Sequence, residues 1–105
     1  MKVEFADIMA CLTKVAREET LEKFLTEASH SDNDDIRNEV AESHHTFAKV
    51  LSKLSEDKCW QVRYAVAKNF NTPVEVLIEL SRDEEWHVRC GVVSNPNTPV
   101  DVLIE

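Results

Sequence analysis

The residues that could do chemistry are few in this sequence, and none of them forms a known catalytic pattern. The single glycine excludes Gly-rich phosphate-binding loops, and neither a metalloprotease helix nor a paired-cysteine zinc motif is present. Cys11, Cys59 and Cys90 are odd in number and widely spaced, which suits free thiols in a reducing compartment better than a disulfide framework. We therefore expect a protein that is not an enzyme and has no cofactor.

The histidines offer one candidate metal site. His44 and His45 are adjacent, and His30 and Asp32 in the preceding polar segment could join them. A metal site normally needs three or four converging ligands, and the two histidines fall where we expect an exposed corner between helices. We favour the exposed corner over a metal site.

Three arginines, Arg37, Arg63 and Arg89, recur at intervals of 26 residues. They could form an anion-binding stripe, or each could pair with a loop carboxylate such as Asp57 or Asp83 and so join neighbouring units. We favour the ion pairs because arginine and aspartate recur together. The net charge of −8 also repels phosphate, so nucleic acid is disfavoured as a partner.

Two tryptophans, Trp60 and Trp86, have the same spacing. Their rings could hold a ligand, but residues that recur in register are more typical of packing between adjacent units. His87 aligns with Gln61, and we expect both side chains to be exposed.

An internal repeat determines how these residues are positioned. Residues 54–79 and 80–105 agree at 16 of 26 aligned positions, and a fixed period of this length indicates an array of small supersecondary units. Threonines, which are favoured at helix N-caps, recur in the same register, each followed five residues later by a leucine. These positions are Thr20, Thr46, Thr72 and Thr98, with Leu25, Leu51, Leu77 and Leu103.

Each threonine is therefore expected to begin a short second helix, with apolar residues four, five and eight positions later on its buried side. Pro73 and Pro99 would take the first helical position. A first helix precedes each second helix, and Trp60 and Trp86 would open the first turns of two of them. Residues 69–71 and 95–97 would form tight corners in which asparagine adopts the left-handed conformation.

The fold class that follows is all-α, an α-solenoid of about three 26-residue helix pairs in a single domain of residues 1–105. Residues 20–105 would form the repeats, and residues 1–19 an N-terminal capping helix. No stretch approaches the roughly 20 apolar residues of a membrane span, and the first residues lack the apolar run of a signal peptide. We expect a cytoplasmic protein.

The pattern Val-Arg-x-x-Val-Ala-x-Asn-x-Asn-Thr-Pro-x-x-Val-Leu-x-x-Leu-Ser-x-Asp, at residues 62–83, resembles the variant leucine-rich repeat of bacterial proteins and, more distantly, HEAT-like arrays. The resemblance implies an α-helix alternating with a shorter helix, and a role as an interaction scaffold. One type in that family carries a cysteine-ligated iron–sulfur cluster near its N-terminus. Here Cys11 has no cysteine nearby, so the cluster is not expected.

The outward face of the second helices is the candidate binding site. Its exposed apolar residues would be Val74, Ile78, Val100 and Ile104, and its acidic border Glu75, Glu79 and Asp101. An apolar strip with a charged rim is typical of a protein contact, and the charge favours a basic partner segment. Alternatively, Val74 and Ile78 pack on the next unit.

We interpret the chain as a non-catalytic scaffold that binds a protein through this face. Self-association through an open C-terminal end, at Val102 and Leu103, is a further expectation about its partners. The alternative function is that of a nucleic-acid-associated helical-repeat protein, whose affinity would fall steeply with salt.

Overall fold

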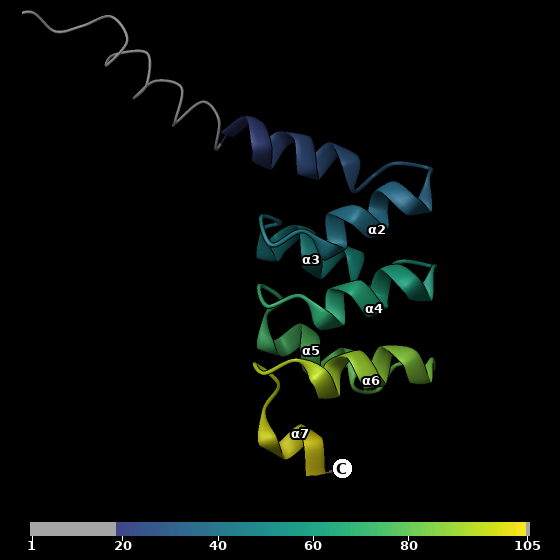
Figure 1. Ribbon diagram of the computed structural model, residues 1–105, viewed down its shortest axis with the longest axis vertical. Coiled ribbons are helices and arrows are strands. Elements are labelled where there is room, and N and C mark those ends of the chain that lie inside the picture. Colours follow the sequence, from purple (N-terminus) through teal and green to yellow (C-terminus); the bar gives the residue numbers. More distant parts are fainter. Residues whose placement is uncertain (1–18, 105) are drawn as a thin grey trace, which may run out of the picture.

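The computed structural model describes residues 19–104, and every regular element in that part of the chain is a helix, as expected for the all-α class (Figure 1). The predicted capping helix in residues 1–19 lies almost entirely outside the described residues. A first helical segment covers residues 19–28. It is followed by α2 (Asp34–Glu42), α3 (Ala48–Leu54), α4 (Trp60–Lys68), α5 (Val74–Leu80), α6 (Trp86–Ser94) and α7 (Val100–Ile104).

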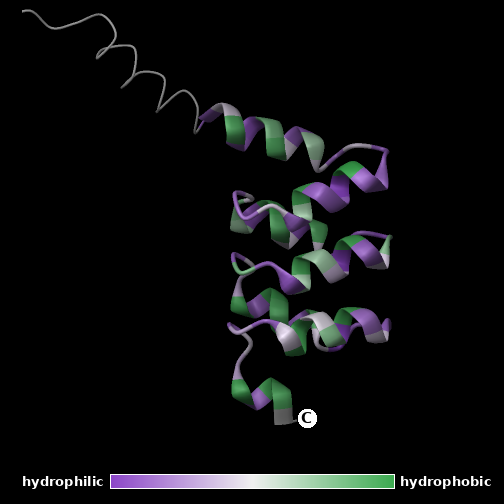
Figure 2. Cartoon of the chain, in the orientation of Figure 1, coloured by the Kyte–Doolittle hydropathy of each residue, from purple (hydrophilic) through white to green (hydrophobic). Residues whose placement is uncertain are grey.

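The helices form two columns, with α2, α4 and α6 in one and α3, α5 and α7 in the other (Figure 1). Helix α4 packs against both α2 and α6. A side chain at Gly91 of α6 would bring its Cβ within 3.0 Å of the Ala67 Cβ and 3.3 Å of the Tyr64 carbonyl oxygen, so the lack of a side chain lets α6 approach α4 closely. Figure 2 shows hydrophobic residues on every helix of both columns.

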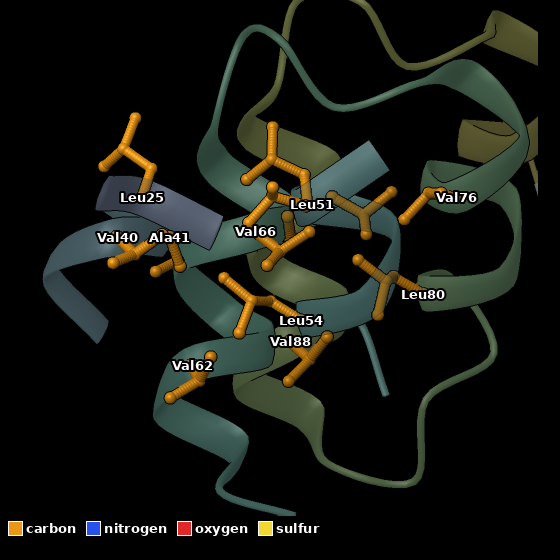
Figure 3. Packing of buried hydrophobic residues seen from close by; sticks show 14 residues of the cluster. Leu25, Val40, Ala41, Leu51, Leu54, Val62, Val66, Val76, Leu80 and Val88 are labelled. Carbon is orange, nitrogen blue, oxygen red and sulfur yellow. The ribbon is translucent and has the colours of Figure 1, made fainter. Parts of the chain in front are cut away.

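The core runs between the two columns, and the expected apolar register fills it. Leu51 and Leu77 are fully buried, and the residues beside them and three positions later are buried as well. Figure 3 shows Leu51, Leu54, Val76 and Leu80 within this core. Burial of each such side chain stabilises the fold by about 1.5–3 kcal/mol, which short helices need because they are marginal alone. The predicted burial is wrong for Phe24 in the first unit, which is 64% exposed, and for Leu103 in α7, which is 45% exposed.

The threonines are not N-caps, contrary to the sequence prediction. Helix α5 begins two residues after Thr72, with Pro73 at its N-cap and no side-chain cap bond from Glu75 or any other residue. Thr20 is itself helical, as is Glu19 before it, so it is not an N-cap. The buried hydroxyl groups instead donate to carbonyl oxygens of the preceding helix, from Thr46 to Val40, Thr72 to Val66 and Thr98 to Val92, each at 2.6 Å. Threonine therefore joins the two helices of a pair.

The asparagine corners also differ from the prediction, because no described residue has a positive φ. Asn69, with φ −76° and ψ 129°, is only 7% exposed. Its Nδ2 donates to the carbonyl oxygens of Ala41 and Ser43, at 2.8 and 2.9 Å. Asn95 repeats the arrangement with Ala67 and Asn69, at 2.8 and 3.0 Å. Asparagine thus holds one helix pair to the preceding pair rather than supplying an unusual backbone conformation.

Within residues 19–104 the structure contains no helix with both the length and the apolar character needed to cross a membrane.

Candidate interaction surfaces

Two of the three register arginines are joined to loop aspartates, as predicted. Arg37 Nε lies 2.8 Å from Asp57 Oδ2, and Arg63 Nε lies 2.8 Å from Asp83 Oδ2. A second guanidinium nitrogen completes each pair, at 3.3 and 3.1 Å. Because these side chains are at most 13% exposed, they are unavailable as an anion-binding stripe.

These contacts set the acidity of the two carboxyl groups. Burial of Asp83 by itself raises its pKa, but the hydrogen bonds from Arg63 and from the Glu85 backbone N–H outweigh burial and leave the pKa below its usual value. The pKa of Asp57 is lowered in the same way, against burial, by Arg37 and the Cys59 backbone N–H. Both groups are therefore ionised links between successive helix pairs.

Arg89 does not follow this pattern. Its side chain is exposed, it donates at 2.7 Å to the backbone carbonyl of Asp83, and it forms no ion pair within the described part of the chain. The repeat register makes Arg89 equivalent to Arg37 and Arg63, but no aspartate between residues 19 and 104 lies in the equivalent position beside it. The prediction of an ion pair is therefore wrong for Arg89.

Trp60 and Trp86 both stack against the ring of His87. The His87 ring lies 4.2 Å from Trp60 and 3.6 Å from Trp86, stacked in both cases, and its Nδ1 is 2.6 Å from Glu85 Oε1. Trp60 thus packs between α4 and α6 as predicted. His87 is partly buried, so its predicted exposure is wrong, because the indole of the preceding pair covers it. Trp86 is 57% exposed, so its predicted packing between units is also wrong.

The candidate face of the second helices is exposed on α5 and α7. Val74 is 42% and Val100 is 68% exposed, while Ile78 is partly buried. The border residues Glu75, Glu79 and Asp101 are all exposed. Ile104 ends α7, but its side chain lies outside the described residues. Two of the four predicted apolar residues are thus available to a partner.

An ion pair between the helix of residues 19–28 and α3 indicates which register positions of successive second helices lie close together. Glu22 Oε1 accepts from Lys49 Nζ at 2.9 Å, from the helix of residues 19–28 to α3. Both side chains are well exposed, so the pair contributes little to stability. In the 26-residue register, Glu22 corresponds to Val74 and Lys49 to Asp101. We therefore expect the Asp101 carboxylate to border Val74.

The candidate metal ligands do not converge. His44 and His45 are exposed, and their rings lie 4.0 Å apart at the corner after α2. No group of three or more His, Cys, Asp or Glu side chains between residues 19 and 104 is arranged to hold a metal ion. Cys59 is a partly buried thiol and Cys90 an exposed one, whereas Cys11 lies outside the described residues.

Sequence reasoning missed a second exposed surface, on the far side of α6. Val93 is 64% exposed although its register equivalent, Ala67, is fully buried. The only signal in the sequence is that the larger Val93 stands where the preceding unit has Ala67.

Comparison with known proteins found no match: no family model, no curated protein and no solved structure is significantly similar to this chain. The exposed surfaces are therefore the features of the molecule that bear on its function.

Proposed function

We propose that this chain is an α-solenoid of about three 26-residue helix pairs, of the variant leucine-rich repeat type, that acts as a non-catalytic cytoplasmic scaffold. Three kinds of contact support the repeat interpretation because each recurs in register: the threonine–carbonyl bond, the asparagine bonds to the preceding pair and the arginine–aspartate pair. Each contact fixes one helix relative to its neighbour, so the array presents a rigid surface.

The outer face of α5 and α7 is the proposed partner-binding surface. The observation that carries the proposal is the exposure of Val74 and Val100, at 42% and 68%, next to the exposed carboxylates of Glu75, Glu79 and Asp101. On α3 the residue equivalent to Val74 is Ala48, and the flanking charges are lysines. The apolar and acidic character is therefore confined to one end of the column.

The partner that fits this surface is a basic amphipathic helix. Its apolar residues would cover Val74 and Val100, and its lysines or arginines would face the acidic border. In such a contact, the burial of apolar area supplies affinity, and charge complementarity raises the association rate and the selectivity. Its affinity would fall moderately with salt, because only the rim is electrostatic.

A synthetic helix with leucine on one side and lysine on the other is a suitable probe, with binding followed by fluorescence anisotropy. The double variant Val74→Asp, Val100→Asp should weaken binding by on the order of tenfold or more, since each aspartate removes apolar contact area and is desolvated by the bound peptide. Ala48→Asp is the matched control, because it places the same charge at the equivalent exposed position of α3. If the double variant and the wild-type chain bound the peptide with equal affinity, the assignment of this face as the binding surface would be refuted.

The nucleic-acid alternative has no specific support among the described residues. Arg37 and Arg63 are engaged with carboxylates, and the net charge is −8. Binding of a DNA or RNA duplex with a steep salt dependence would favour that alternative over the scaffold.

A further inference from the structure

A stacked aromatic contact joins α6 to α4. The His87 ring of α6 lies 4.2 Å from the Trp60 ring of α4, with 18° between the ring planes. The neighbouring Trp86 ring stacks on the same imidazole at 3.6 Å. One turn further along α6, Gly91 lies so close to α4 that an added Cβ would come within 3.0 Å of the Ala67 Cβ. The imidazole is therefore held against two indole rings where the two helices pack closely.

A carboxylate lies beside the same imidazole. Glu85 Oε1 is 2.6 Å from His87 Nδ1, and the side chains of Glu85 and His87 are 29% and 36% exposed. The histidine thus touches water and can exchange a proton with it, although the indoles cover part of its ring. A protonated imidazole would give Glu85 a charge-assisted hydrogen bond in place of a neutral one.

The nearby charged groups of α4 have other partners. Arg63 pairs with Asp83 at 2.8 Å. Lys68 Nζ lies 5.3 Å from the centre of the Tyr64 ring, and Tyr64 in turn meets Trp60 edge-on at 6.4 Å. Helix α4 therefore offers the imidazole an uncharged indole face, and such a face attracts a cation.

The structure describes two junctions between successive first helices, and the stacked contact belongs to the second of them. In the 26-residue register, Trp60 and His87 correspond to Asp34 and Gln61 at the junction of α2 with α4. Neither of these residues has an aromatic ring, and Gln61 has no charge at any pH. A proton taken up by His87 therefore acts where α6 meets α4 and leaves the α2–α4 junction unchanged.

We propose that His87 is a pH-sensitive joint that tightens the packing of α6 on α4 when it is protonated. Histidine is the side chain whose charge ordinarily changes between about pH 5 and pH 8. The protonated ring gains a cation–π attraction to Trp60 and an ion pair with Glu85, and the unfolded chain has neither. The added stability is present when the ring is protonated and is lost as the pH rises and the proton leaves. This property is independent of the partner-binding role of α5 and α7.

Urea unfolding at about pH 5 and about pH 8 tests the joint. The variant is His87→Gln, because glutamine stands at the equivalent position of α4. Its loss in the folding equilibrium constant should be on the order of fivefold greater at the lower pH, the size of one partly exposed cation–π contact. The ion pairs of Asp57 and Asp83 are present in both chains, so they do not affect the comparison. His30→Gln, at an exposed histidine, is the matched control and should behave as the wild-type chain.

Tryptophan fluorescence reports on the contact directly, since the two tryptophans of the chain, Trp60 and Trp86, both stack on His87. In a Trp86→Phe chain, the emission of Trp60 should fall as the pH is lowered from about 8 to about 5. The reason is that a protonated imidazole quenches an indole that it touches. The fall should be absent when His87→Gln is added.

Other outcomes would overturn the proposal. Equal pH dependence of stability in the wild-type chain and in His87→Gln would exclude the joint, as would Trp60 emission that does not change with pH. A greater loss at the higher pH would mean that protonation loosens the contact. If His87→Gln failed to fold, His87→Phe would replace it, since phenylalanine keeps a stacked ring and takes up no proton. A His87→Phe chain whose stability depended on pH as strongly as the wild type would also exclude the joint.

Discussion

Replacing Asn69 by alanine tests the bonds that join one helix pair to the preceding pair. The side chain donates at 2.8 and 2.9 Å to two carbonyl oxygens, and its Oδ1 accepts from the Asn71 backbone N–H at 2.8 Å. A net contribution of about 0.5–1.5 kcal/mol for each bond gives a loss of roughly 1.5–4.5 kcal/mol. The true value should lie in the upper half of that range, because the Ala41 carbonyl oxygen is buried and loses a partner.

Urea unfolding followed by circular dichroism at 222 nm measures this loss, and thermal unfolding should show a fall in Tm of on the order of 10–20 °C. Asn38→Ala is the control, since Asn38 makes an exposed side-chain bond to Glu42 and alanine favours the helix. The control should change the free energy of unfolding by less than about 0.5 kcal/mol. A similarly small change for Asn69→Ala would refute the view that the corner asparagine joins successive pairs.

Leu77→Ala should lower the free energy of unfolding by about 2–5 kcal/mol, because Leu77 is fully buried and the change leaves a cavity; Glu79→Ala on the exposed side of the same helix should have almost no effect in the same urea melt. The free energy of unfolding should also fall in acid. The folded-state pKa values of Asp57 and Asp83 lie below their unfolded values, so the stability they contribute is present above about pH 4 and is lost as the pH falls through the folded values. Asp83→Asn should make urea midpoints measured from pH 7 to pH 3 less dependent on pH, and an unchanged slope would contradict the assigned ion pair.

The helical class and most of the buried positions could be predicted from the sequence because they depend on periodicity alone. Leu51 and Leu77 lie on the apolar side of their helices, so they are buried when those helices pack against others. The arginine–aspartate pairs could be predicted because both members recur. The roles of Thr72 and Asn69 could not, since the same residue types favour caps and turns locally, whereas here their side chains bond to carbonyls distant in sequence.

The candidate surfaces were only partly predictable. Val74 and Val100 were placed correctly on the outside, because their positions oppose the buried register. The exposure of Trp86 and Val93 could not be predicted, because the repeat register predicts for each residue the same burial as for the equivalent residues of the other units. Whether another helix packs against α6 depends on the three-dimensional packing, which the residues of α6 alone do not indicate.

The asparagine bonds run in one direction along the chain, since Asn69 and Asn95 each donate to carbonyl oxygens of the helix pair before their own. A tandem duplication of one such unit would therefore bring its own donor and its own acceptors, leaving no group stranded at the new junction. Lengthening the chain by duplicating such a helix pair would therefore require no compensating substitution at these asparagine bonds.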